Sequence, residues 1–483
     1  MRVRMEPKKE RLLSQIIEFG LLALIILSPL PAASVHEWSI LVIQIAVLVM
    51  TASYILMQNK PACSESLTRL LKWPRILFVG LSVFLVFQMI PLPKFLVSIL
   101  FPGNASYQKL FSQDYASLSS LSISIIPAHT LRTGLEILSY VLVGFLIIKT
   151  VTTRRQIMRF FGVLVAMGVF EAFYGLFEFA NKSPRILFYR KMYDLESVSG
   201  TFVNRNHFSG YLEMIVPLAI GLFIARVDLF SLSGLKWKQK IARFSEKNLS
   251  INVLIFLAII LMSLAIVFSR SRSGVSILVL AFLIFFELTV LYFRAGRRQK
   301  NWIKMFLGVS FLLITIFSLY VGINATIQRF SLDRILQEER PVFWAQTVRI
   351  FSRFPLFGSG LGTVTSLLPD FEKEGLLVRA FHSHNDYLEY LAELGIVGLA
   401  LLLGGILLLA IPSFLVWKER RHPEVKGLAL GGIVSILCIL IHSLTDFNLH
   451  IPANMLLFSV VVSLTAVVSF YKKGEARVDR ETK

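Results

Sequence analysis

Twelve long apolar stretches constrain the fold of this chain more than any other feature of its sequence. Each approaches the ~20 mainly apolar residues that a helix needs to cross a bilayer. They span residues 12–28, 38–57, 76–92, 131–149, 160–180, 207–225, 251–269, 275–293, 303–322, 396–416, 427–446 and 454–471. Because backbone groups within a bilayer must hydrogen-bond to one another, we predict an all-α polytopic membrane protein with about twelve transmembrane helices.

The charges between these stretches predict the orientation of the helices. An even number of crossings places both termini on one side, together with 33 of the 50 Lys and Arg residues. The positive-inside rule makes this side cytoplasmic. The net charge of +20 is therefore interpreted as a topology signal, and nucleic acid is not an expected partner. The segments on this side are 1–11, 58–75, 149–159, 226–250, 294–304, 417–426 and 472–483.

The opposite, external side receives most of the polar motifs. Its longest connection, residues 323–395, can form helices of its own and is expected to cap the bundle. We therefore predict four parts of the chain: transmembrane helices one to nine in 1–322, the external loop 323–395, the last three helices in 396–472 and a cytoplasmic tail in 473–483.

Residues 340–398 form the longest polar interval, and ionisable groups beside a membrane often mark a functional site. Arg340 precedes an amphipathic stretch, where it either contacts an anion or pairs with Glu338 or Glu339. His384 stands just before a predicted helix. As a neutral imidazole it can accept a proton, or it can simply satisfy hydrogen bonds where the helix starts.

Glycines in this interval resemble a phosphate-binding loop at Gly358, Gly360 and Gly362. No strand precedes them and no phosphate-binding lysine follows, so nucleotide binding is not predicted. We expect a tight turn whose backbone amides face the site. Gly395 and Gly398 are expected to let the following helix pack closely.

Histidine and carboxylate residues at 382–389 also suggest a metal site. His382, His384, Asp386 and Glu389 are all metal-ligand types, but their alternate spacing suits a strand whereas a helix is predicted to begin here. We therefore predict no metal and no other cofactor.

Arginines occur at predicted corners of the membrane bundle. Arg270 and Arg272 lie in the turn SRSRSG, and Arg132 lies at the external start of an apolar stretch. Guanidinium groups bind phosphate oxygens through paired hydrogen bonds. Alternatively, these side chains reach toward lipid head groups.

Two further polar motifs border apolar stretches. Asn204, Arg205, Asn206 and His207 offer donors to sugar hydroxyls or phosphate, or else form a polar helix cap. In HSLTDFNLH, His442 and Asp446 are four residues apart, so we favour a structural hydrogen-bonded pair on one helix face.

Together these motifs resemble the O-antigen ligase and O-antigen polymerase superfamily of bacterial membrane glycosyltransferases. The resemblance covers roughly residues 130–470. It is sharpest at His384 and Asn385, which are followed after nine residues by Gly395 and Gly398. The other matching stretches are GTFVNRNHFSGYL, SRSG, RPVFW with PLFGSGLGT, and HSLTDFNLHIPAN.

The resemblance implies a GT-C-like fold in the bacterial inner membrane with a large periplasmic loop. It implies a metal-independent, inverting transfer of glycan from undecaprenyl diphosphate to an acceptor hydroxyl, with lipid A-core as the acceptor in the ligases of lipopolysaccharide biosynthesis. The implied catalytic residues are His384, Arg340 and Arg272. The expected substrate-binding residues are Arg270, Arg132, Asn385, Asn204, Arg205, Asn206 and His207.

Several alternatives remain open at this level. A polysaccharide polymerase would use the same donor with a second lipid-linked glycan as acceptor, and a protein O-oligosaccharyltransferase would modify Ser or Thr. A polytopic transporter is the competing class. Against it, the polar residues gather on one face, and no matching pair of Gly- or Pro-broken segments divides the chain into halves.

Overall fold

The structure of the chain is a computed structural model. It describes residues 7–58, 65–111, 114–182, 185–191, 195–226, 248–292, 297–321, 323–333, 338–371 and 381–471. The predicted tail 473–483, most of the connection 226–250 and residues 372–380 of the predicted external loop lie outside these ranges.

Helices make up almost all of the described secondary structure, which confirms the all-α polytopic prediction. The first half contains α1 (Pro7–Leu27), η1 (Ala32–Ser34), α2 (Glu37–Leu56), α3 (Glu65–Leu70), α4 (Lys72–Met89), β1 (Leu92–Pro93), α5 (Lys94–Leu100), α6 (Pro102–Phe111), β2 (Ser120–Leu121), α7 (Pro127–Thr150), α8 (Arg154–Ala180), β3 (Arg185–Ile186), β4 (Tyr189–Arg190) and α9 (Arg205–Arg226). Strands β1 and β2 pair antiparallel, as do β3 and β4.

The second half continues the helical pattern without further described strands. It contains α11 (Asn248–Phe268), α12 (Arg272–Tyr292), α13 (Arg297–Val321), α14 (Asn324–Ile327), η2 (Gln328–Phe330), α16 (Arg340–Arg353), α17 (Val364–Leu367), η3 (Leu368–Phe371), α18 (Asp386–Glu419), α19 (Pro423–His442), η4 (Asn448–His450) and α20 (Pro452–Phe470). The predicted loop 323–395 is thus partly helical.

Eleven helices among the described residues are long and apolar enough to cross a membrane, one fewer than predicted. The exception is the first stretch, in α1, where Glu10, Arg11 and Glu18 fall within every segment long enough to span. Glu18 forms an ion pair with Arg159 of α8.

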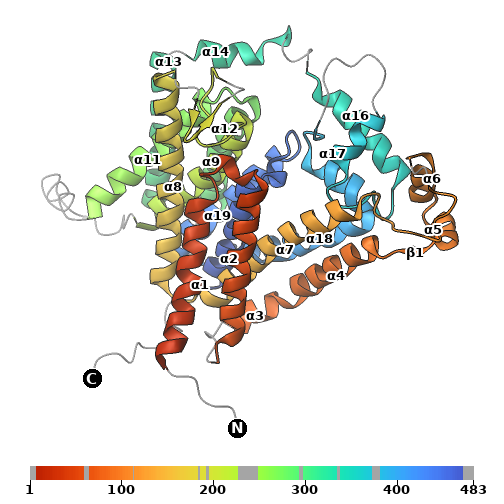
Figure 1. Cartoon of the computed structure of the whole chain (residues 1–483). Helices are drawn as coiled ribbons and strands as arrows, with labels where there is room; N and C mark the ends of the chain where they lie inside the picture. The colour runs from red at the N-terminus through yellow and green to blue at the C-terminus, as the bar shows by residue number, and fades with distance from the viewer. Residues whose placement is uncertain are drawn as a thin grey trace, which may run out of the picture.

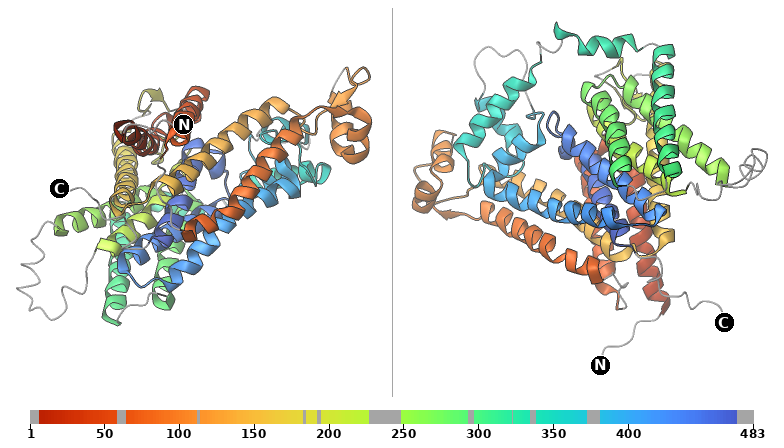
Figure 2. Two further views of the ribbon diagram at one scale, coloured as in Figure 1. Left: turned by 90° about the horizontal axis from the view of Figure 1, so that it is seen from below. Right: turned by 180° about the vertical axis from the view of Figure 1, so that it is seen from behind.

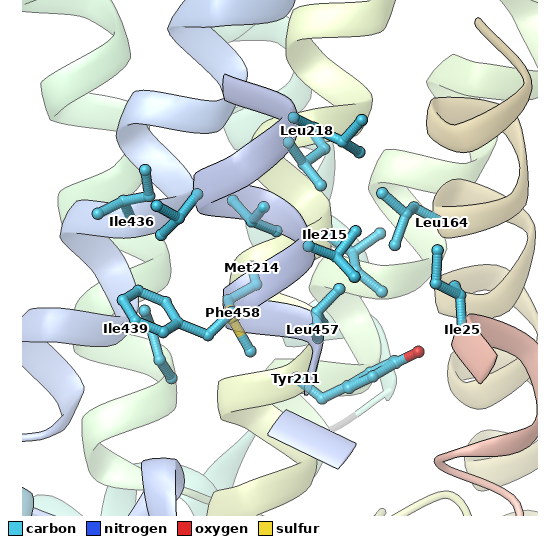
Figure 3. Packing of buried hydrophobic residues seen from close by; sticks show 14 of the residues in the cluster. Ile25, Leu164, Tyr211, Met214, Ile215, Leu218, Ile436, Ile439, Leu457 and Phe458 are labelled. Atoms are coloured by element: carbon cyan, nitrogen blue, oxygen red, sulfur yellow. The ribbon is translucent and has the colours of Figure 1, made fainter. Parts of the chain in front are cut away.

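The centre of the bundle is formed by α9, α19 and α20, which are buried on nearly all sides. Figure 3 shows Ile215 of α9, Ile439 of α19 and Leu457 of α20 among the packed side chains. Small residues bring α9 against α19, because a Cβ on Gly221 would lie 2.6 Å from the carbonyl oxygen of Gly427. This rigid centre holds the ends of α9 and α19 in fixed positions.

Helix α18 changes direction at Gly395, whose φ of 63° interrupts the helix. The carbonyl groups of Ala392 and Glu393, which would otherwise be orphaned by the break, accept hydrogen bonds from the amides of Ser359 and Gly360, each at 3.0 Å. The glycine turn therefore supports α18, and these two amides do not face the site as we predicted. Beyond the break, α18 packs alongside α4, as Figure 2 shows.

Candidate active site

A cavity of about 300 Å³ lies between the starts of α9, α12 and α16. Helices α12, α14 and α16 lie toward the end of the molecule opposite the start of α1 (Figure 1). Segments far apart in the sequence therefore meet at one place. The cavity is lined by Arg205, Asn206, Arg272, Ser273, Arg329, Glu338, Glu339, Arg340, Phe343 and His384.

Three arginines in the cavity are the first residues of their helices. Arg205 begins α9, Arg272 begins α12 and Arg340 begins α16. A helix N-terminus carries partial positive charge and unpaired amide donors, so each guanidinium adds to a field that already attracts anions. With Arg329, the lining arginines outnumber the two lining glutamates, and the cavity is suited to a ligand with more than one negative charge.

Glu338 shows how two of these arginines share an anion. Its carboxylate forms ion pairs with Arg272 and with Nε of Arg340, the latter at 3.4 Å. The two guanidinium groups therefore lie close enough to contact one oxyanion together. A phosphate presents oxygens to arginine in a similar way.

Asp446 is the buried centre of hydrogen bonding beside the cavity. Its Oδ2 accepts from Asn206 Nδ2 at 2.7 Å and from Arg340 at 3.2 Å, and its Oδ1 lies 3.1 Å from His384 Nδ1. His207 Nε2 is 3.6 Å from Oδ1. Burial alone would raise the pKa of Asp446, but the nearby His207, the hydrogen bond with His384 and the charge of Arg340 hold that pKa well below its usual range. Asp446 is therefore a carboxylate at neutral pH.

The Asp446 carboxylate determines which ring nitrogen of a neutral His384 carries the proton and which keeps the lone pair. An ionised carboxylate only accepts hydrogen bonds, so Nδ1 of His384 carries the proton and Nε2 keeps its lone pair. The ring is stacked against Phe343, with centroids 6.0 Å apart, and meets Phe447 edge-on at 4.8 Å. His384 thus lines a cationic cavity, with Nδ1 held by Asp446 and its ring held between two aromatic side chains.

The backbone at His384 is unusual for a non-glycine residue, with φ of 52°. Its carbonyl accepts a hydrogen bond from Trp344 Nε1 at 3.2 Å. The next residue, Asn385, caps α18 through Leu388 N and donates to the carbonyl of Leu444 at 2.9 Å. Contacts from α16 and from the segment after α19 therefore hold His384 in place.

Residues 257–403 match the family model described as O-antigen ligase. The chain carries an O-antigen ligase domain. No curated protein shows significant similarity to the chain. The match confirms the resemblance drawn from the motifs and indicates a membrane glycosyltransferase of the O-antigen ligase and polymerase type, which uses a glycan donor and an acceptor.

The O-antigen ligase domain does not contain the whole cavity. Arg272, Arg340 and His384 lie inside the matched region, whereas Arg205 precedes it and Asp446 follows it. Helix α9 and the segment after α19 therefore complete the site, and any functional test needs the full chain.

Five predicted site residues line the cavity together, and of the two arginines in SRSRSG one is among them. Arg272 is a lining residue, while Arg270 is not. Arg270 has φ of 58°, lies 3.3 Å from Glu196 and packs near the ring of Phe179. The turn directs the two arginines to different places. The lining predicted residues are Arg205, Asn206, Arg272, Arg340 and His384.

Four other predicted binding residues lie outside the cavity lining. Arg132 pairs with Glu37 at 2.7 Å. Asn204 accepts a hydrogen bond from the Asn206 amide at 2.8 Å, which is the helix-cap alternative. Asn385 is the cap of α18, and the buried His207 contacts the cavity only through Asp446.

Sequence reasoning assigned Asp446 the wrong partner. We favoured a pair between His442 and Asp446, but α19 ends at His442, so helical spacing does not apply beyond it. His442 Nδ1 instead lies 2.9 Å from Glu213 Oε2. The sequence signal that could have identified Asp446 as a site residue is its position just after a helix, beside other predicted polar motifs. Arg329 also lines the cavity, but it lies in no motif that the sequence analysis recognised.

The suspected metal ligands have different partners: His384 faces Asp446, while His382 and Asp386 make the contacts that follow. His382 Nδ1 lies 2.7 Å from Glu389, and His450 Nδ1 lies 2.7 Å from Asp386. Among the residues that the structure describes, no group of three or more His, Cys, Asp or Glu side chains is arranged to hold a metal ion.

Proposed function

We propose that the chain transfers a glycan from undecaprenyl diphosphate to an acceptor hydroxyl, with lipid A-core as the acceptor. The observation that carries this proposal is the His384–Asp446 pair beside a cavity lined by arginines. The pair supplies a base for a hydroxyl, and the arginines supply fixed positive charge for a diphosphate leaving group.

The chemistry follows from these two parts. The acceptor oxygen attacks the anomeric carbon from the side opposite the diphosphate, and its proton passes to Nε2 of His384. The bond between the anomeric carbon and the phosphate oxygen breaks, and its electron pair leaves with undecaprenyl diphosphate. One displacement inverts the anomeric configuration.

The arginines act on the charge that develops as this bond breaks. Arg272 and Arg340 already share one carboxylate, so the same two groups can contact one phosphate of the donor. Fixed donors of this kind stabilise a transition state without moving a proton. The transfer therefore requires no metal ion in this proposal.

The deciding experiment supplies the purified full chain with an undecaprenyl diphosphate-linked glycan and lipid A-core. We expect undecaprenyl diphosphate to be released and the glycan to appear on lipid A-core. A lengthened lipid-linked glycan would instead identify a polymerase, and a glycosylated Ser or Thr would identify a protein transferase. Movement of intact donor across a vesicle without glycan transfer would identify a transporter.

The proposal also places the cavity on the periplasmic side of the inner membrane. The support is the excess of basic residues on the side of both termini. In a cysteine-free background, Ser352→Cys on exposed α16 should react with an impermeant thiol reagent in intact spheroplasts. Reaction only after the membrane is opened would contradict this orientation.

A further inference from the structure

A second cavity, of about 280 Å³, lies between α4, α7, α18 and α20. Almost all of its lining is apolar, and no acidic side chain contributes to it. Its residues on α18 run from Leu402 to Leu409, whereas the active-site cavity lies at the start of that helix. Residues 386–402 of α18, which include the break at Gly395, lie between the two cavities. This groove is therefore distinct from the active site.

One end of the groove is cationic. Arg75, near the start of α4, and Lys149, near the end of α7, both line it. Neither side chain has a hydrogen-bond or ion-pair partner within the described ranges of the chain. Helix α3, which leads into α4, lies toward the same end of the molecule as the start of α1 (Figure 1). Arg75 and Lys149 thus stand at one end of an apolar groove with no counter-charge among the described residues.

We propose that this groove binds an anionic diacyl phospholipid. One acyl chain lies along the apolar walls, and the phosphate contacts Arg75 and Lys149. Basic pockets between membrane helices on the side that carries most basic residues select anionic head groups. Two positive charges in a groove whose described lining contains no carboxylate favour a lipid with net negative charge over a zwitterionic one.

The lipid-linked donor is a poorer fit for this groove. Its diphosphate belongs at the arginine cavity, near the other end of α18, whereas the charges of Arg75 and Lys149 lie at the opposite end of the groove's helices. The occupant proposed here is a membrane lipid that is not consumed, so the proposal stands independently of the transfer reaction.

Native mass spectrometry of the purified full chain can test this assignment. The protein is offered equal amounts of phosphatidylglycerol and phosphatidylcholine with identical acyl chains. We expect several-fold preferential retention of phosphatidylglycerol. Arg75→Gln combined with Lys149→Gln should remove the preference without unfolding, because Arg75 is exposed, Lys149 is half-buried and neither has a protein partner among the described residues.

A matched control removes two charges from the same end of the bundle outside the groove. Arg69→Gln combined with Lys72→Gln should keep the preference of the parent. If both double variants lost the preference for phosphatidylglycerol equally, the preference would be due to general surface charge, and the proposal would be overturned.

A third variant tests the apolar part of the site. Val141 lines the groove, and Val141→Trp should fill it and lower the retention of both lipids. Undiminished retention of phosphatidylglycerol in this variant would contradict an acyl chain in the groove. Displacement of phosphatidylglycerol by an equal amount of undecaprenyl phosphate would also overturn the assignment.

Discussion

Two histidine–aspartate pairs lie near the start of α18, and they differ in what surrounds the second ring nitrogen. His384 Nδ1 faces Asp446 at 3.1 Å, and His450 Nδ1 faces Asp386 at 2.7 Å. The side chain of His384 is 27% exposed and lines the arginine cavity, whereas that of His450 is 9% exposed.

The neighbourhood of Nε2 explains why only one pair is suited to proton transfer. His450 Nε2 lies 3.6 Å from Glu389, so two carboxylates surround the ring. Burial would lower the pKa of His450, but Glu389 and Asp386 raise it to about 10. His450 is therefore a fixed cation at neutral pH, whereas His384 lines the arginine cavity. A histidine–aspartate pair becomes a base only when its outer nitrogen meets substrate instead of another carboxylate.

The largest effect is expected at His384. His384→Asn tolerates the positive φ of this position but removes the base. Single-turnover transfer should fall by about 10²- to 10⁴-fold while donor binding persists. The rate of the parent should fall on acidification, because a protonated ring accepts no proton. Intact turnover in His384→Asn would end the base assignment, and lost donor affinity with unchanged chemistry would assign His384 to binding.

The arginines should separate by position within SRSRSG. Arg272→Lys and Arg340→Lys should each lower transfer by roughly 10²- to 10³-fold, because an ammonium group cannot reproduce paired guanidinium hydrogen bonds. Arg270→Lys is the matched control and should remain near the parent rate. Steady-state transfer at equal protein levels measures all three. A reversed order, with only Arg270→Lys inactive, would show that the wrong arginine had been chosen.

Asp446 tests whether the carboxylate sets the form of the imidazole. Asp446→Asn can donate to Nδ1, which places the proton on Nε2 and blocks it as a base. By analogy with other groups that orient a functional histidine, we expect a loss of roughly 10- to 100-fold, mainly in kcat. The acid limb of the pH–rate profile should also move. An unchanged profile with a raised KM would make Asp446 a binding group.

Substitution of His450 should have the smallest effect on transfer. It should instead change the stability of the protein. Its pKa is raised from 6.5 to about 10, so its stabilising contribution is complete below about pH 6.5 and declines as pH rises toward 10. The free energy of unfolding should fall by a few kcal/mol over this pH range. Thermal unfolding of the parent should show this decline, and His450→Gln should show much less. A parent melting temperature independent of pH over this range would contradict a buried ion pair.

Local patterns were enough to predict most of the scaffold. The stretch 207–225 corresponds to α9 and 454–471 to α20, because membrane helices are dictated by the apolar length of their own segment. The apolar length was less decisive for α1, because Glu10, Arg11 and Glu18 interrupt its apolar sequence. The lining residues Arg272, Arg340 and His384 were also recognisable, since each stands at the start of a helix beside polar neighbours.

Partners across the chain could not be predicted in the same way. Asp446 meets Asn206 across 240 residues, and His442 meets Glu213 across 229 residues. The spacing of His442 and Asp446 predicted a helical pair, but the helix ends between them. Which of two arginines enters the cavity likewise depends on one turn, where Arg270 adopts a positive φ.

The break at Gly395 separates the placement of His384 from the length of the membrane-crossing part of α18. A continuous helix would couple the two. In an unbroken helix, one inserted or deleted residue rotates everything beyond it by about 100°. Here, Ser359 and Gly360 pin the carbonyls of Ala392 and Glu393 above the break. The membrane-crossing part of α18 could therefore lengthen or shorten to suit bilayers of different thickness without turning His384 away from the cavity.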